Sequence, residues 1–197
     1  MRQLVPLLIV ALSALCCATG PRHERSVIDK VQQSIVRITG KTEDGDLGTC
    51  TGIVVKPARI LTAAHCVMPI TYIDGVVANL AREDTHADLA LFVAPSARPN
   101  LPLRDAPVQR FEPLVGIGYA FSMTRLTALN VTAFLVDIQP DPAMAPGLLV
   151  EGQYIPGMSG GPVVDRDGRM VGIIQQGNVG TGYGVTVPTI KAFLLGL

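Results

Sequence analysis

The order in which one histidine, one aspartate and one serine follow each other is the feature that most constrains the fold of this chain. His65 lies in the segment TAAHC, Asp88 opens the segment DLALF, and Ser159 lies among glycines in GMSGGP. A serine hydroxyl is a weak nucleophile at neutral pH, and imidazole is its usual activating base. A carboxylate at the head of an apolar strand is suited to hold that imidazole in one tautomer. The sequence therefore predicts a catalytic triad of His65, Asp88 and Ser159.

The glycines around Ser159 have a second consequence. They let the backbone turn sharply and leave the N–H groups of Gly157 and Ser159 free to bind a negatively charged oxygen. We expect these two N–H groups to form an oxyanion hole.

Each motif taken alone has a simpler structural interpretation. A serine among glycines is common in turns, a histidine after two alanines is often a packed residue, and an aspartate before an apolar run is often a cap. The three motifs together, in this order, favour catalysis over these structural interpretations. Asp84 is the alternative carboxylate, although Asp88 has the better strand context, and His86 is expected at the surface.

A competing hydrolase fold is excluded by the chain order. The pattern G-x-S-x-G around Ser159 also matches the nucleophile elbow of α/β-hydrolases, which place their aspartate and histidine after the serine. The histidines of this chain are His23, His65 and His86, and all of them precede Ser159.

The three motifs resemble those of the trypsin-like serine peptidases, from about Val27 to the C-terminus. TAAHC matches the family's histidine motif, DLAL resembles its DIAL motif, and GMSGGP matches GxSGGP. Residues 31–38 are similar to the bacterial HtrA/Deg branch, and Met158 stands where zymogen-activated members carry an aspartate. Because the resemblance covers almost all of the 197 residues after the first twenty, we expect no PDZ domain of the kind that many HtrA/Deg relatives carry.

The resemblance implies an all-β fold of two antiparallel six-stranded β-barrels with short N- and C-terminal helices. Residues 21–110 would form the first barrel, with His65 and Asp88, and residues 111–197 the second, with Ser159. Many short strands at regular turn spacing fit such an architecture. The expected strands are 35–39, 52–55, 59–62, 76–81, 89–93, 114–118, 127–135, 148–150, 162–164, 170–175 and 182–187, with helices at 27–33 and 188–195.

The first twenty residues have the pattern of an export signal. A basic residue, a twelve-residue apolar run and small residues before the cleavage position predict a periplasmic or secreted protein. Attachment as a lipoprotein at Cys16 or Cys17 and a retained membrane anchor stay open. Cleavage after Ala18 leaves the pair Cys50 and Cys66, which the family resemblance implies is a disulfide.

Composition limits the partners. The net charge is zero and 16% of the residues are charged, so the chain has no basic footprint for nucleic acid. A zinc site at the cysteines lacks a second pair of ligands at metal spacing. We expect protein or peptide substrates, no cofactor and no metal.

The substrate pocket is inferred by resemblance alone. Gln153 would form the base of the pocket for the P1 residue, the residue before the cleaved bond, with walls from Gln175, Gln176, Gly177 and the region of Gly184. A neutral base leaves a P1 lysine or arginine without a partner, so an uncharged P1 residue of small to medium size is expected. An inactive binding module and a self-processing peptidase are the alternatives to a serine endopeptidase.

Overall fold

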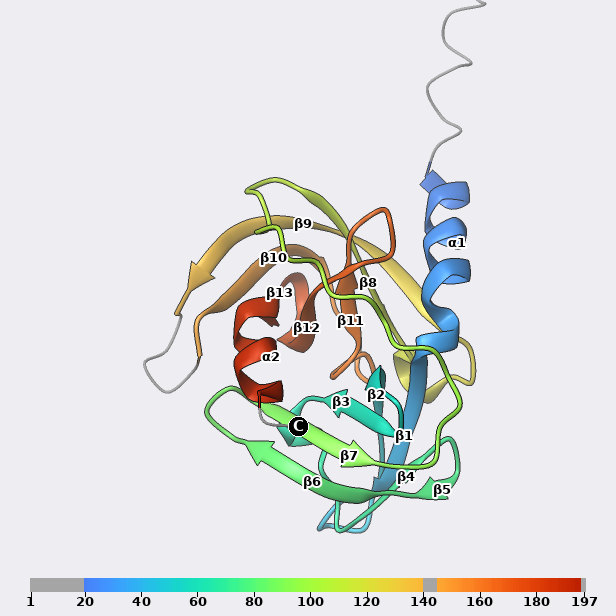
Figure 1. Cartoon of the computed structure of the whole chain (residues 1–197). Coiled ribbons are helices and arrows are strands. Elements are labelled where there is room, and N and C mark those ends of the chain that lie inside the picture. The colour runs from blue at the N-terminus through green and yellow to red at the C-terminus, as the bar shows by residue number, and fades with distance from the viewer. Residues whose placement is uncertain (1–19, 140–144, 196–197) are drawn as a thin grey trace, which may run out of the picture.

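The computed structural model describes residues 20–139 and 145–195, which form two antiparallel β-sheets and two α-helices (Figure 1). The first sheet contains β1 (Ile35–Lys41), β2 (Leu47–Lys56), β3 (Arg59–Thr62), β4 (Ile70–Ile73), β5 (Val76–Val77), β6 (Asn79–Asp84) and β7 (Leu89–Val93). The second contains β8 (Pro113–Gly118), β9 (Thr127–Ile138), β10 (Gly147–Gln153), β11 (Pro162–Val164), β12 (Met170–Gly177) and β13 (Val179–Thr186). The all-β prediction is confirmed.

The first sheet differs in detail from the expected barrel. It has seven strands in the order β5-β4-β1-β2-β3-β7-β6 and remains a half-barrel, whereas six strands in a closed ring were expected. One edge strand, β5, has two residues and pairs with β4 alone, so it offers little backbone for closing the ring. The predicted strand over residues 76–81 is divided at Ala78, whose N–H donates to the carbonyl of Thr71 instead (2.9 Å).

The second sheet closes as expected. Its six strands form a barrel in the order β10-β13-β12-β11-β8-β9, with every pairing antiparallel. The hairpin between β11 and β12 turns at residues 165–168, and Gly168 there has a φ of 83°. A positive φ of this kind favours glycine because a Cβ atom would be strained.

Three apolar clusters form the core. One lies within the first sheet, around Ile38 and Phe92, and another within the second, around Leu148 and Val163. The third combines residues of both sheets, including Leu89 and Leu91 of β7 with Ile117 and Ile173. Because alternate residues of β7 enter different clusters, this strand is apolar on both faces. Burial between the sheets holds them in a defined relative position.

Both helices pack against the second sheet, and the C-terminal helix also reaches the first. Helix α1 (Gly20–Val31) is longer than the predicted helix, and it contacts β8 and β9 of the second sheet. Helix α2 (Val187–Leu194) contacts β12 and β13, and its Phe193 ring lies 4.9 Å from the guanidinium of Arg82 on β6. None of the helices in the described ranges is long and apolar enough to cross a membrane. The predicted export signal, with Cys16 and Cys17, lies outside the described residues except for its last position.

Candidate active site

His65 and Asp88 meet at the edge of the first sheet. His65 lies in the short helix η2 (Ala64–Cys66) after β3, and Asp88 immediately precedes β7, which pairs with β3. The Nδ1 atom of His65 lies 2.9 Å from Oδ2 and 3.1 Å from Oδ1 of Asp88, and the backbone N–H of His65 donates to Oδ1 (2.9 Å). The carboxylate therefore holds both the ring and the backbone of the histidine.

This contact determines the histidine tautomer. An ionised carboxylate only accepts hydrogen bonds, so Nδ1 of His65 carries the proton in the neutral ring. The lone pair is then on Nε2, on the other side of the imidazole. An imidazole with this tautomer can accept a proton from a nucleophile at Nε2.

Ser159 comes from the second barrel and faces the same cleft. It lies in the turn between β10 and β11, and a cleft of about 510 Å³ is lined by His65, Asp88 and Ser159 together. Its hydroxyl donates to the backbone carbonyl of Gln175 (3.2 Å). The structure thus brings the three predicted triad residues to one cleft between the sheets.

The other two candidates have different places. Asp84 accepts a hydrogen bond from the N–H of Ala87 (2.9 Å) and stabilises the turn before Asp88. His86 is exposed, as predicted.

The two peptide groups that carry the predicted oxyanion-hole N–H groups are held in place by hydrogen bonds to their carbonyl oxygens. The carbonyl of Pro156 accepts from the N–H of Phe121 (2.7 Å), and the carbonyl of Met158 accepts from the N–H of Gly161 (2.9 Å). In a trans peptide the N–H points opposite to the carbonyl, so these bonds orient the N–H groups of Gly157 and Ser159. Within the described ranges, neither of these two N–H groups donates to a backbone carbonyl.

Gly157 itself is fixed by close packing. Its φ is 94°, and a Cβ atom there would lie 2.2 Å from the carbonyl oxygen of Tyr119. No other residue fits this position without displacing that backbone.

Thr51 on β2 connects this turn to the first sheet, and sequence reasoning missed it. Its backbone N–H donates to the carbonyl of Ser159 (2.8 Å), and its hydroxyl donates to the carbonyl of Gly157 (2.8 Å). The same hydroxyl accepts from the N–H of Tyr119 (2.9 Å), and the side chain is fully buried. Nothing in the sequence distinguishes this threonine from its neighbours in the strand.

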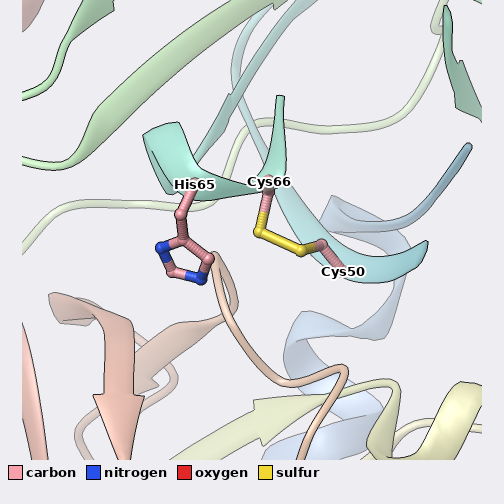
Figure 2. A group of neighbouring side chains, drawn as sticks. All are labelled: Cys50, His65 and Cys66. Atoms are coloured by element: carbon pink, nitrogen blue, oxygen red, sulfur yellow. A yellow bond between two sulfur atoms is a disulfide. The ribbon is translucent and has the colours of Figure 1, made fainter. Parts of the chain in front are cut away.

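The predicted disulfide joins Cys50 of β2 to Cys66, beside the histidine (Figure 2). The two Cα atoms are 6.0 Å apart, and the bond closes a loop with a sequence separation of 16. One ligand atom from each of Cys50, His65 and Cys66 lies within 4.8 Å of the others, which is a spacing that suits a metal. Because the sulfurs are bonded to each other, they are not thiolate ligands, and the disulfide explains their proximity.

The predicted pocket residues have different positions. Gln175, Gln176 and Gly177 line the cleft. Gln153 is exposed at the end of β10, and Gly184 is paired within the barrel wall. Neither is among the described residues that line the cleft, where Tyr154 lies instead of Gln153.

Tyr154 occupies space that three glycines provide. A Cβ atom would lie 3.1 Å from its ring at Gly116 of β8, 2.6 Å at Gly177 of β12, and 1.4 Å at Gly182 of β13. The side chain is buried, and this burial raises the pKa of its hydroxyl. The aromatic ring therefore fills the barrel beneath the cleft.

Comparisons with known proteins agree with this geometry. The family model described as the trypsin-like peptidase domain matches residues 50–173, which is more than half of the chain. The chain belongs to the trypsin-like peptidases. This peptidase is accordingly a trypsin-like serine endopeptidase, a hydrolase. No curated protein matches its sequence.

Solved structures show the same fold at low sequence identity. The active form of the Rv3671c protease from M. tuberculosis has 22% identity and a TM-score of 0.78, over 89% of this peptidase and 86% of that chain. The HtrA-type protease AlgW, solved with a tripeptide, has 16% identity and a TM-score of 0.75, over 86% and 61% of the two chains. The serine endoprotease from Yersinia pestis has 16% identity and a TM-score of 0.73, over 86% and 64%. This peptidase therefore shares its fold with HtrA-type proteases such as AlgW.

Proposed function

We propose that this peptidase hydrolyses peptide bonds through an acyl-enzyme on Ser159, with His65 as the base and Asp88 as the orienting acid. The observation that carries the proposal is the contact of the Asp88 carboxylate with Nδ1 of His65, in the cleft that Ser159 also lines. The tautomer leaves Nε2 as the only proton acceptor on the ring.

The reaction begins with rotation of the Ser159 hydroxyl away from the carbonyl of Gln175 and toward Nε2 of His65. Its oxygen attacks the scissile carbonyl while Nε2 takes the proton, and Asp88 stabilises the imidazolium. The same proton passes to the leaving amine. Water then attacks the ester with His65 again as base, which releases the acid and restores Ser159.

The N–H groups of Gly157 and Ser159 support the charged intermediate. The hydrogen bonds that the carbonyls of the same two peptide groups accept fix these N–H groups before the substrate arrives, so the site needs little reorganisation when charge develops. Loss of one such donor costs about 10²–10³ in kcat in enzymes of this chemistry.

The substrates are proteins or peptides with an uncharged P1 residue. Asp88 is the only acidic residue among the described residues that line the cleft, and its carboxylate is held by His65. A buried P1 lysine or arginine would therefore lack a partner. The ring of Tyr154 shortens the pocket from below, which favours small apolar side chains.

The proposal includes export to the periplasm or the cell exterior. The support is the disulfide between Cys50 and Cys66, since such bonds persist in oxidising compartments. The apolar run with its basic start, within residues 1–20, supports the same location.

The decisive experiment labels the purified protein with a fluorophosphonate, which reacts with activated serines. We expect label on Ser159, with both label and peptide hydrolysis lost in Ser159→Ala. Ser96→Ala is the matched control, because Ser96 lies in the connection between the sheets and should keep full labelling. Hydrolysis that persists in Ser159→Ala would contradict the mechanism.

A further inference from the structure

The backbone of Asp88, which positions the carboxylate beside His65, has a strained conformation. Its φ of 47° lies in the left-handed region, which is uncommon for residues with a side chain. Such conformations persist only where the surrounding structure determines them. The left-handed conformation therefore requires contacts that hold the turn ending at Asp88.

Gln175 of β12 supplies contacts to this turn from the opposite sheet. Its amide Nε2 donates to the carbonyl of Ala87 (2.5 Å) and to the carbonyl of Asp88 (3.2 Å). The side chain is 2% exposed, so both bonds are shielded from water. One further bond holds the turn to the second barrel, from the N–H of Ala145 to the carbonyl of His86 (3.2 Å).

The orientation of the Gln175 amide is determined by its partners. Two carbonyls need a donor, so the NH₂ group must face them. Among the residues that the structure describes, the buried Oε1 atom then has no hydrogen-bond partner, which costs free energy. Position 175 thus carries a glutamine whose buried Oε1 atom costs free energy, whereas an apolar side chain at this position would not have this cost.

Gln175 also contacts the nucleophile. Its backbone carbonyl accepts the hydroxyl of Ser159 at 3.2 Å. One residue thus contacts Ser159 with its main chain and the turn of Asp88 with its side chain.

We propose that Gln175 is a positioning residue, whose side-chain amide holds the Asp88 turn against the second barrel and thereby aligns the Asp88–His65 pair with Ser159. The proposal rests on the function proposed above. The side chain acts through Asp88, because both hydrogen bonds of its amide are to carbonyls of the turn that ends there. Catalysis then depends on the relative position of the two sheets. The Gln175 amide fixes that position through a specific polar contact, in addition to the apolar cluster between the sheets.

The test is a double-mutant cycle of Gln175→Met, Asp88→Ala and the combination, with an activated peptide ester so that weak variants stay measurable. Methionine has a similar length and volume but no amide donor. We expect Gln175→Met to lower kcat by roughly 10- to 10²-fold with KM changed less than about twofold, because misplacement of a catalytic group reduces the rate more than binding. In the Asp88→Ala background the same substitution should change kcat by less than about threefold.

Additive losses would overturn the proposal, since a merely structural residue would reduce activity equally in both backgrounds. An unchanged kcat in Gln175→Met would also overturn it. Gln33→Met, at an exposed glutamine that is not among the residues lining the cleft, is the control and should match the wild type. If Gln175→Met does not fold, Gln175→Asn is used with the same criteria, because its amide is one methylene too short to reach both carbonyls.

The cycle separates this proposal from the function on which it rests. Wild-type activity in Asp88→Ala would refute the proposed triad itself. A large loss in Asp88→Ala, combined with an additive effect of Gln175→Met, would refute the positioning role alone.

Discussion

Substitution of Thr51 by valine tests how the turn of the nucleophile is held to the first sheet. Valine has nearly the same shape, so the change removes the hydroxyl without opening a cavity. The carbonyl of Gly157 and the N–H of Tyr119 then lose their partner in a fully buried position. A buried polar group left unsatisfied costs about 1–3 kcal/mol, so the two groups together predict a loss of ~2–6 kcal/mol in the free energy of unfolding.

Thr49→Val provides a matched control on the same strand. The hydroxyl of Thr49 is buried and has no hydrogen-bond partner in the described structure, so its removal should be neutral or stabilising. Both free energies are measured by urea denaturation, from the midpoint and slope of the transition. Both substitutions exchange a buried hydroxyl for a methyl group, and of the two hydroxyls that of Thr51 forms the hydrogen bonds described above.

Activity should follow the same pattern. Because the Gly157 carbonyl is released in Thr51→Val, the adjacent backbone loses rigidity, and we expect kcat to fall by up to roughly 10²-fold. Thr49→Val should keep the wild-type kcat. Equal effects of the two substitutions on stability would refute the view that Thr51 holds the turn through its hydroxyl.

Three further predictions concern the disulfide, acid stability and the pocket. Reduction of Cys50–Cys66 should lower the free energy of unfolding by ~3 kcal/mol, measured by denaturation with and without a reductant, and a stability unchanged by reduction would contradict this. The guanidinium of Arg104 donates a hydrogen bond to the carboxylate of Glu112 and lowers its pKa in the folded protein. The contribution of this pair to the free energy of unfolding is therefore fully present above the unfolded pKa of about 4.3 and is lost as the pH falls through the lower folded pKa. The melting temperature of Glu112→Gln should therefore fall less on acidification than that of the wild type. Identical pH profiles of the two proteins would show that the Arg104–Glu112 pair does not cause the loss of stability in acid. Tyr154→Ala should cost about 3–5 kcal/mol and shift cleavage from small toward large apolar P1 residues, as a survey of cleaved peptides would show, whereas an unchanged P1 profile would exclude the ring from the pocket.

The triad motifs were readable from the sequence because each is local. The turn around Ser159 needs its glycines within a few residues, and the strand after Asp88 is apolar on both faces, so the residues themselves carry the signal. Strand β3 was predicted with its observed bounds for the same reason, since it is short, apolar and flanked by turns. The disulfide followed from the family resemblance and not from the spacing of the cysteines.

The residues of the substrate pocket could not be predicted from the sequence as the triad residues were. Side chains alternate between the two faces of a strand, so an error of one residue at the end of β10 exchanges an exposed Gln153 for a buried Tyr154. The contacts of Gln175 with Ala87 and Asp88 join residues 88 and 87 positions apart, and they depend on how the two sheets dock. Strand β4 was missed because its four residues contain only two repeats of the exposed–buried pattern.

The glycines around Tyr154 limit the order in which this peptidase can change its specificity. A side chain added at Gly177 or Gly182 collides with the aromatic ring, so neither position can vary while the tyrosine is present. A smaller residue at 154 removes the collision at Gly182, whose nearest contacts are all atoms of the ring. At Gly177 an added Cβ would still lie 2.8 Å from the Cβ of residue 154 and 2.9 Å from the carbonyl oxygen of Thr181. In directed evolution, therefore, substitutions at 182 should be recovered only in lineages that first lost the ring, whereas position 177 should remain glycine, and screens that randomise the two glycines alone should return the parent sequence.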